Sequence, residues 1–149
     1  MKLTIRACAA MALSSVFFSG VAAQTTEVPK IELPAACTQS GADMSQQMAM
    51  GQDMTKQMQG GQMNEANMGY MNAMMGMHQP MMQGAMAPDP DVAFNCAMIA
   101  HHQGAIAMAK VQLQYGKDDD AKEMAQKTID QQGKEIEEMT KWLQEHAKS

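Results

Sequence analysis

The sequence predicts an all-α protein, a compact four-helix bundle that follows an extended N-terminal arm. Three observations support this prediction. Methionines recur at spacings of three, four and seven between residues 41 and 86, and apolar residues keep a helical period after residue 87. Residues suited to cap helices flank the C-terminal segments. The chain has 149 residues, which is enough for one domain of the usual size.

The first 23 residues have the features of a signal peptide. Lys2 and Arg6 precede an apolar run, and Val21-Ala22-Ala23 is the small-residue pattern that a signal peptidase cleaves. We expect cleavage after Ala23. No later stretch approaches the roughly 20 apolar residues of a membrane span. We therefore expect a periplasmic or secreted protein that does not insert into a membrane.

The mature chain divides into an arm and a helical metal-binding domain. Residues 24–40 contain two prolines and no helical period, so they are expected to be extended. Residues 41–149 form the domain, of which 41–86 is Met-rich. There we expect two modest helices, broken at Gly60-Gly61, with the second disturbed by Pro80.

Residues 87–149 are expected to form a helical hairpin. Asp89 is a suitable N-cap with Pro90 in the first turn, and Gly116 is a suitable helix terminator. These signals predict a helix over about 90–115.

The second helix of the hairpin is predicted over about 119–147. Its apolar residues, which include Met124, share one face of about 140°. The three residues Asp118, Asp119 and Asp120 place negative charge where the helix dipole favours it. Only about three residues connect the two helices, so they should pack antiparallel.

The net charge of the mature chain argues against polyanionic partners. The mature chain has nine Lys, no Arg and 16 acidic residues, which gives a formal net charge of −7. Nucleic acids and anionic membrane surfaces are bound through clusters of Lys and Arg. An acidic surface instead suits cations.

Methionine dominates the composition. The chain has 20 Met but three Phe, and 14 of the Met lie between Met44 and Met86, a stretch without Leu, Ile, Val or Phe. Thioether sulfur is a soft donor that favours Cu(I), and Ag(I) should follow as its mimic. The alternative is that flexible Met fills an irregular core or contacts varied partners. The candidate ligands in this segment are Met44, Met48, Met54, Met58, Met71, Met74, Met75, His78, Met81 and Met82.

Two adjacent histidines interrupt the apolar run MIAHHQGAIAMA, residues 98–109. Neighbours are about 100° apart on a helix, so the two rings cannot point the same way. His102 shares the centre of the apolar face with Phe94 and Met98, whereas His101 lies nearer the edge beside Met108. We therefore expect His102 to be the more buried of the two.

The facing helix supplies a carboxylate beside this face. Glu135 lies at the edge of the apolar arc near Met139, where an unpaired carboxylate would be costly. Imidazole binds Cu(I), Cu(II), Zn and Ni. A metal site that prefers Cu(I) and accepts Cu(II) would therefore explain why histidines, methionines and a carboxylate share this face. The alternative is that the histidines are core residues with hydrogen-bond partners. The candidate ligands are Met98, His101, His102, Met108, Glu135 and Met139.

Residues 91–143 resemble the domain of unknown function 305 family. Its signature is a Met, two adjacent His, a Gly/Ala-Ile pair, a second Met, and a later helix that ends in Glu-Ile, Met and Trp-Leu. The resemblance implies a ferritin-like helical bundle, and the family's exported, Met-rich members resemble CopM-like periplasmic copper-binding proteins. It implies as metal ligands Met98, His101, His102, Met108 and Met139. This chain has Ala100 where Pro often stands, and one copy of the His-His motif.

Cys37 and Cys96 remain after cleavage, and an exported protein favours a disulfide between them. A thiolate copper site and two idle thiols are the alternatives. No motif for an enzyme nucleophile or a di-iron centre is present.

The sequence thus predicts a copper-binding protein for tolerance or homeostasis, without enzyme activity. It would exchange metal ions with another copper-handling envelope protein. A cuprous oxidase or other ferritin-like oxidoreductase, and a helical bundle that binds no metal, are the alternatives.

Overall fold

The computed structural model describes residues 29–38 and 64–147, and the regular elements of this part of the chain are all helices. A short 3-10 helix, η1 (Ala35–Cys37), precedes three α-helices, which are α2 (Glu65–Ala85), α3 (Pro90–Tyr115) and α4 (Asp119–His146). The expected signal peptide with its cleavage site, and the expected helix before Gly60, lie outside the described residues.

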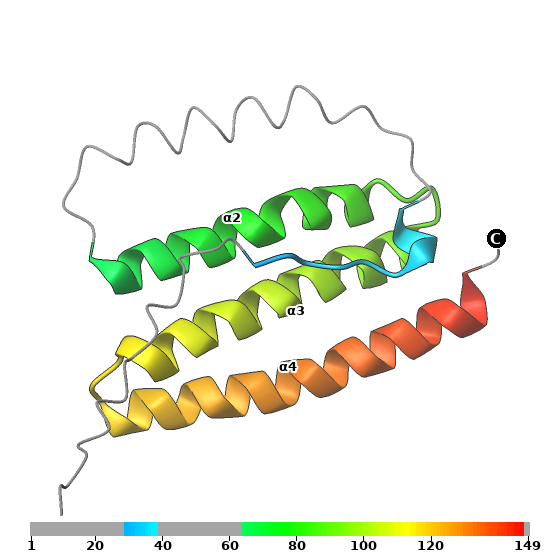
Figure 1. The fold of residues 1–149 in the computed structure, drawn as a ribbon. Coiled ribbons are helices and arrows are strands. Elements are labelled where there is room, and N and C mark those ends of the chain that lie inside the picture. The colour runs from blue at the N-terminus through cyan, green and yellow to red at the C-terminus, as the bar shows by residue number, and fades with distance from the viewer. Residues whose placement is uncertain (1–28, 39–63, 148–149) are drawn as a thin grey trace, which may run out of the picture.

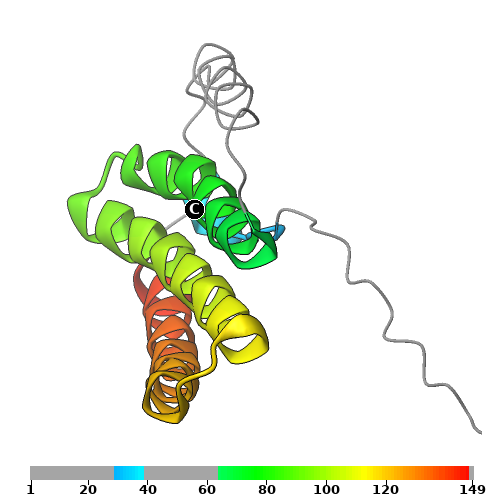
Figure 2. The same cartoon turned by 90° about the vertical axis from the view of Figure 1, so that its left-hand side faces the viewer.

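Helix α3 is the central helix (Figure 1). It lies between α2 and α4 and packs along both of them. Viewed along the helices, the three form a bent layer rather than a closed ring (Figure 2). Within the described ranges the protein therefore shows three of the four predicted α-helices.

The hairpin of α3 and α4 begins and ends where the cap residues predict. The Asp89 side chain accepts hydrogen bonds from the backbone N–H groups of Asp91 and Val92, and Asp118 caps α4 by accepting one from Ala121. Gly116 ends α3 with φ −63° and ψ 150°, so it does not adopt the left-handed conformation usual for a terminal glycine. A Cβ at this position would lie 2.5 Å from the Gln112 carbonyl oxygen, which explains the glycine sterically.

Helix α2 runs unbroken through Pro80, contrary to the expected disturbance. A proline inside a helix removes one backbone hydrogen bond. Close packing on α3 offsets this loss, because small residues let the two backbones approach. Gly84 lies directly against the backbone of Cys96 and Ala97.

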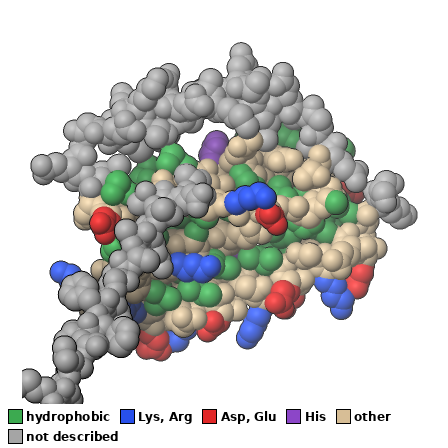
Figure 3. Space-filling model, viewed as in Figure 1, with side chains coloured by type: hydrophobic (Ala, Val, Ile, Leu, Met, Phe, Trp, Pro, Cys, Tyr) green, Lys and Arg blue, Asp and Glu red, His purple; other side chains and the backbone are tan. Residues whose placement is uncertain are grey.

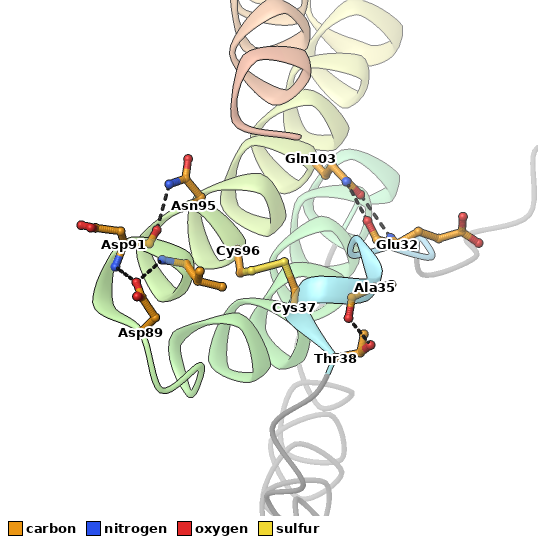
Figure 4. Close-up of a disulfide and its surroundings, with 10 residues drawn as sticks. Glu32, Ala35, Cys37, Thr38, Asp89, Asp91, Asn95, Cys96 and Gln103 are labelled. Atoms are coloured by element: carbon orange, nitrogen blue, oxygen red, sulfur yellow. Dashed lines mark hydrogen bonds between the residues drawn. A yellow bond between two sulfur atoms is a disulfide. The ribbon is translucent and has the colours of Figure 1, made fainter. Parts of the chain in front are cut away.

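The core lies where residues 33–37 meet α3 and α4. Its fully buried side chains are Cys37, Cys96, Ile99 and Leu143. Cys37 and Cys96 form a disulfide, the pairing favoured by the sequence (Figure 4). Both cysteines are at most 1% exposed, so solvent does not reach the bond in the folded state.

Residues 29–34 run along α3 without helix or strand. The Gln103 side chain pairs with the backbone of Glu32, donating to its carbonyl oxygen at 3.0 Å and accepting from its N–H at 3.3 Å (Figure 4). Together with the disulfide, this pair fixes the segment to α3 at two places.

Charged side chains gather along α4, at the lower edge of the molecule in Figure 3. Two residues expected on apolar faces are in fact exposed, Phe94 at 62% and Met124 at 61%. Met124 lies at the edge of the apolar arc of α4, which is wider than the surface that α3 covers.

None of the helices among the described residues is long and apolar enough to cross a membrane.

Candidate metal site

The two adjacent histidines of α3 differ in exposure. His102 is 7% exposed and faces α4, whereas His101 is exposed. Their ring centroids are 5.8 Å apart, with an interplanar angle of 63°. The order of burial is the one predicted from helical phase, because neighbours on a helix differ by about 100°.

His102 forms a hydrogen bond across the α3–α4 interface. Its Nε2 atom lies 2.7 Å from Oε2 of Glu135. The other carboxylate oxygen, Oε1, accepts a hydrogen bond from the Gln131 side chain at 3.0 Å. The pKa of Glu135 is lowered, first by the Gln131 hydrogen bond and further by His102, against an opposing effect of burial. The carboxylate is therefore ionised at neutral pH.

This contact fixes the tautomer of His102. An ionised carboxylate can only accept hydrogen bonds, so Nε2 must carry the proton and donate. In a neutral imidazole the other nitrogen, Nδ1, then holds the free lone pair. Nδ1 of His102 is buried and has no hydrogen-bond partner. The ring thus offers a buried lone pair and is held in place from its opposite side.

Two thioethers lie one helical turn from this pair. Met98 is four residues before His102, and Met139 is four residues after Glu135. Because α3 and α4 run antiparallel, both steps lead in the same direction along the interface, which places Met98 opposite Met139. Both are partly buried, and Met139 packs against the core.

His101 and Met108 belong to a different side of α3. Met108 lies six residues after His102 and therefore about 120° around the helix from it. Both residues lie within one turn of Gly104, whose backbone is in contact with the Met77 side chain from α2. The six predicted ligands of the hairpin are thus divided between the α4 side and the α2 side of α3.

The predicted ligands of α2 are also divided. Met77 contacts α3, and Met74 and Met81 lie three residues before it and four after it, at the edge of this side of α2, where Met74 is 38% exposed. A second group lies on the opposite side of α2, where the spacings four, three and four form one stripe. This stripe consists of Met71, Met75, His78 and Met82. The predicted ligands Met44, Met48, Met54 and Met58 lie outside the described residues.

No three His, Cys, Asp or Glu side chains lie close enough to hold a metal ion within residues 29–38 and 64–147. A site with three or more side-chain ligands in this part of the chain would therefore include other donors, such as thioether or amide groups. A cavity of about 390 Å³ lies between residues 29–31, α2 and α3, and none of the candidate ligands lines it.

Sequence reasoning missed two residues of these groups. Met77 has the helical spacing to Met74 and Met81 that would have included it. Gln131 lies four residues before Glu135, a spacing at which side chains on a helix meet. This spacing is common on helices, so on its own it indicated no role.

A comparison with curated proteins finds no match. A comparison with protein families matches residues 17–143 to the family described as Domain of unknown function (DUF305). The matched range covers most of the chain, including all of α2 and α3 and most of α4. The chain therefore belongs to the DUF305 family.

Proposed function

We propose that this chain is an exported copper-binding protein that sequesters or carries Cu(I), and also accepts Cu(II), for copper tolerance or homeostasis. The observation that carries the proposal is the state of His102. Metal-binding histidines commonly donate their second ring N–H to a carboxylate, which fixes the ring and makes the ligating nitrogen more basic. His102 has this arrangement with Glu135, and its Nδ1 lone pair is buried without a partner.

The competing interpretation is a structural histidine, and its bond to Glu135 fits that interpretation equally well. The two differ at Nδ1. A structural residue would leave a buried acceptor unsatisfied, which costs about 1–3 kcal/mol. A bound ion would use that lone pair.

The type of metal follows from the available donors. Thioethers from Met98 and Met139 lie one turn away, and the chain as a whole is rich in methionine. Soft sulfur ligands favour Cu(I) over Zn(II), Fe(II), Ca²⁺ and Mg²⁺. The donor set therefore supports copper as cargo, with Ag(I) as its mimic.

Export is part of the proposal. The Cys37–Cys96 disulfide is buried in the core, and such bonds persist in oxidising compartments such as the periplasm. A copper carrier there would pass its ion to another copper-handling envelope protein. The proposal assigns the chain no catalytic turnover, so copper loading should not cause oxygen consumption.

We also propose that the complete domain is a four-helix, ferritin-like bundle. Cys37 is bonded to Cys96, which lies beside Gly84 near the C-terminal end of α2. Asn64 caps the other end of α2. The described residues on either side, Cys37 and Asn64, thus lie at opposite ends of α2, and the methionine spacings before Gly60 favour a further helix.

Metal competition tests the proposed function. The mature protein should take Cu(I) from a chelator of known affinity and bind Ag(I), and it should bind Zn(II) and Fe(II) much more weakly. Replacing two thioethers at constant bulk, in the double variant Met98→Leu/Met139→Leu, should lower Cu(I) affinity. Met124→Leu, at an exposed position, should not. Equal affinity for Cu(I) and Zn(II), or no copper binding, would refute the function.

A further inference from the structure

Two buried side-chain acceptors have no hydrogen-bond partner in the described part of the chain. They are Nδ1 of His102 and Oε1 of Gln132. An amide oxygen can only accept hydrogen bonds or bind a cation. A buried acceptor without a partner is costly, so two of them in one small protein require an explanation.

Gln132 lies in the middle of the surface that α4 presents to α3. The buried residues Ala125 and Leu143 lie seven residues before it and eleven after it, which are spacings of one helix face. An apolar side chain would be the ordinary choice at such a position. A partly buried glutamine with an unsatisfied oxygen replaces it here.

The register of the two helices brings Gln132 to the neighbourhood of His102. Glu135 contacts His102 and lies three residues after Gln132. In antiparallel register, Gln132 lies opposite Ala105, which is three residues after His102. Ala105 and the buried Ala109 are small, so they leave space on α3 beside the glutamine side chain.

The two acceptors differ in character from the thioethers. Amide oxygen is a hard donor, and imidazole binds Cu(II) as well as Cu(I). On the basis of the proposed copper function, we propose that Gln132 Oε1 and His102 Nδ1 together bind Cu(II) at the α3–α4 interface. Gln132 is then the residue that adapts this site to the divalent ion, whereas the thioether groups bind Cu(I).

Substitution of Gln132 tests this assignment. In Gln132→Leu the hard donor is lost and an unsatisfied buried acceptor disappears. Cu(II) affinity should fall by about tenfold or more, and the Cu(II) electron paramagnetic resonance spectrum should change. Cu(I) affinity should remain that of the wild type, and the Tm of the metal-free protein should stay equal or rise. Gln144→Leu makes the same chemical change at an exposed position of α4 and should alter none of these quantities.

A second variant covers the case in which Gln132→Leu does not fold. Gln132→Glu keeps an oxygen at the site and adds charge, so it should raise Cu(II) affinity and lower the Tm of the metal-free protein. A Gln132→Leu protein with wild-type Cu(II) affinity would overturn the assignment, as would a Gln132→Glu protein with unchanged affinity. Wild-type protein that binds Cu(I) but no Cu(II) would overturn this inference and the Cu(II) part of the proposed function, but not its Cu(I) part. Wild-type protein that binds neither ion would overturn the whole proposed function.

Discussion

At the scale of single residues, Glu135 connects two helices through its carboxylate. One oxygen accepts a hydrogen bond from Gln131 on its own helix, and the other accepts one from His102 on α3. These bonds are made to the ionised form, which explains the lowered pKa. The protonation state of one side chain therefore affects both the packing of α3 on α4 and the orientation of the His102 ring.

Acid should weaken this connection. A group whose pKa is lower in the folded protein stabilises the fold above its unfolded pKa, here 4.5, and that contribution is lost as the pH falls through the folded pKa. As the pH falls below 4.5, the wild-type Tm should therefore fall more steeply than the Tm of Glu135→Gln. Glu137→Gln, at an exposed position of the same helix, should retain the wild-type slope. Parallel Tm curves for the wild type and Glu135→Gln would contradict the pKa assignment.

At the scale of elements, Gly84 allows the backbones of α2 and α3 to lie close together. A Cβ on Gly84 would lie 2.6 Å from the Cys96 carbonyl carbon and 2.7 Å from the Ala97 nitrogen, which are backbone atoms and cannot move independently. Gly133 on α4 is different, because nothing lies within 4 Å of the position its Cβ would occupy.

These two glycines make a matched pair for substitution. Gly84→Ala should destabilise the protein by about 1–3 kcal/mol, because overpacking outweighs the better helix propensity of alanine. Gly133→Ala should stabilise it by about 0.5–1 kcal/mol, since only the helix propensity changes. Urea unfolding of both variants measures the two changes. If both were stabilising, the close approach of α2 to α3 would be wrong.

Local signals account for how well each element could be predicted. The bounds of α3 follow from Asp89 and Gly116, because capping depends on a few neighbouring residues. The unbroken course of α2 through Pro80 was not predictable in this way, since it depends on packing against a helix distant in sequence. Phe94 was assigned to an apolar face from its phase, but no described element covers it.

For the candidate site, the burial of individual residues was predictable from the sequence, but the contacts between their atoms were not. Helical phase indicated that His102 is buried and that Glu135 lies beside the apolar face. The unsatisfied atoms of His102 and Gln132 were not predictable, because they depend on which side-chain atoms meet across the interface. The difference in burial between His102 and His101, by contrast, was predictable, because adjacent residues of a helix lie about 100° apart.

At the scale of the whole molecule, the candidate donors occupy separate places. One group lies between α3 and α4, another between α2 and α3, and a third on the side of α2 away from α3. Ions bound at such separate groups would be independent of one another. This arrangement suits a protein that holds more than one ion.

The disulfide has a consequence for the integrity of the chain. It joins cysteines 59 residues apart, and the whole run from Met44 to Met86 lies between them. The Met-rich segment is therefore part of a closed covalent ring. A protease that cuts the ring once opens it without releasing either fragment, so the cleaved protein would keep all its thioethers in one molecule.

Trypsin can test this property, because Lys56 is the only Lys or Arg between Cys37 and Cys96. Limited digestion that cuts only after Lys56 should leave one species with the mass of one added water, and the fragments should separate only after a reductant is added. Separation without a reductant would show that the ring is not closed. Under the proposed function, a chain cut once in this ring would keep its candidate metal ligands in one molecule.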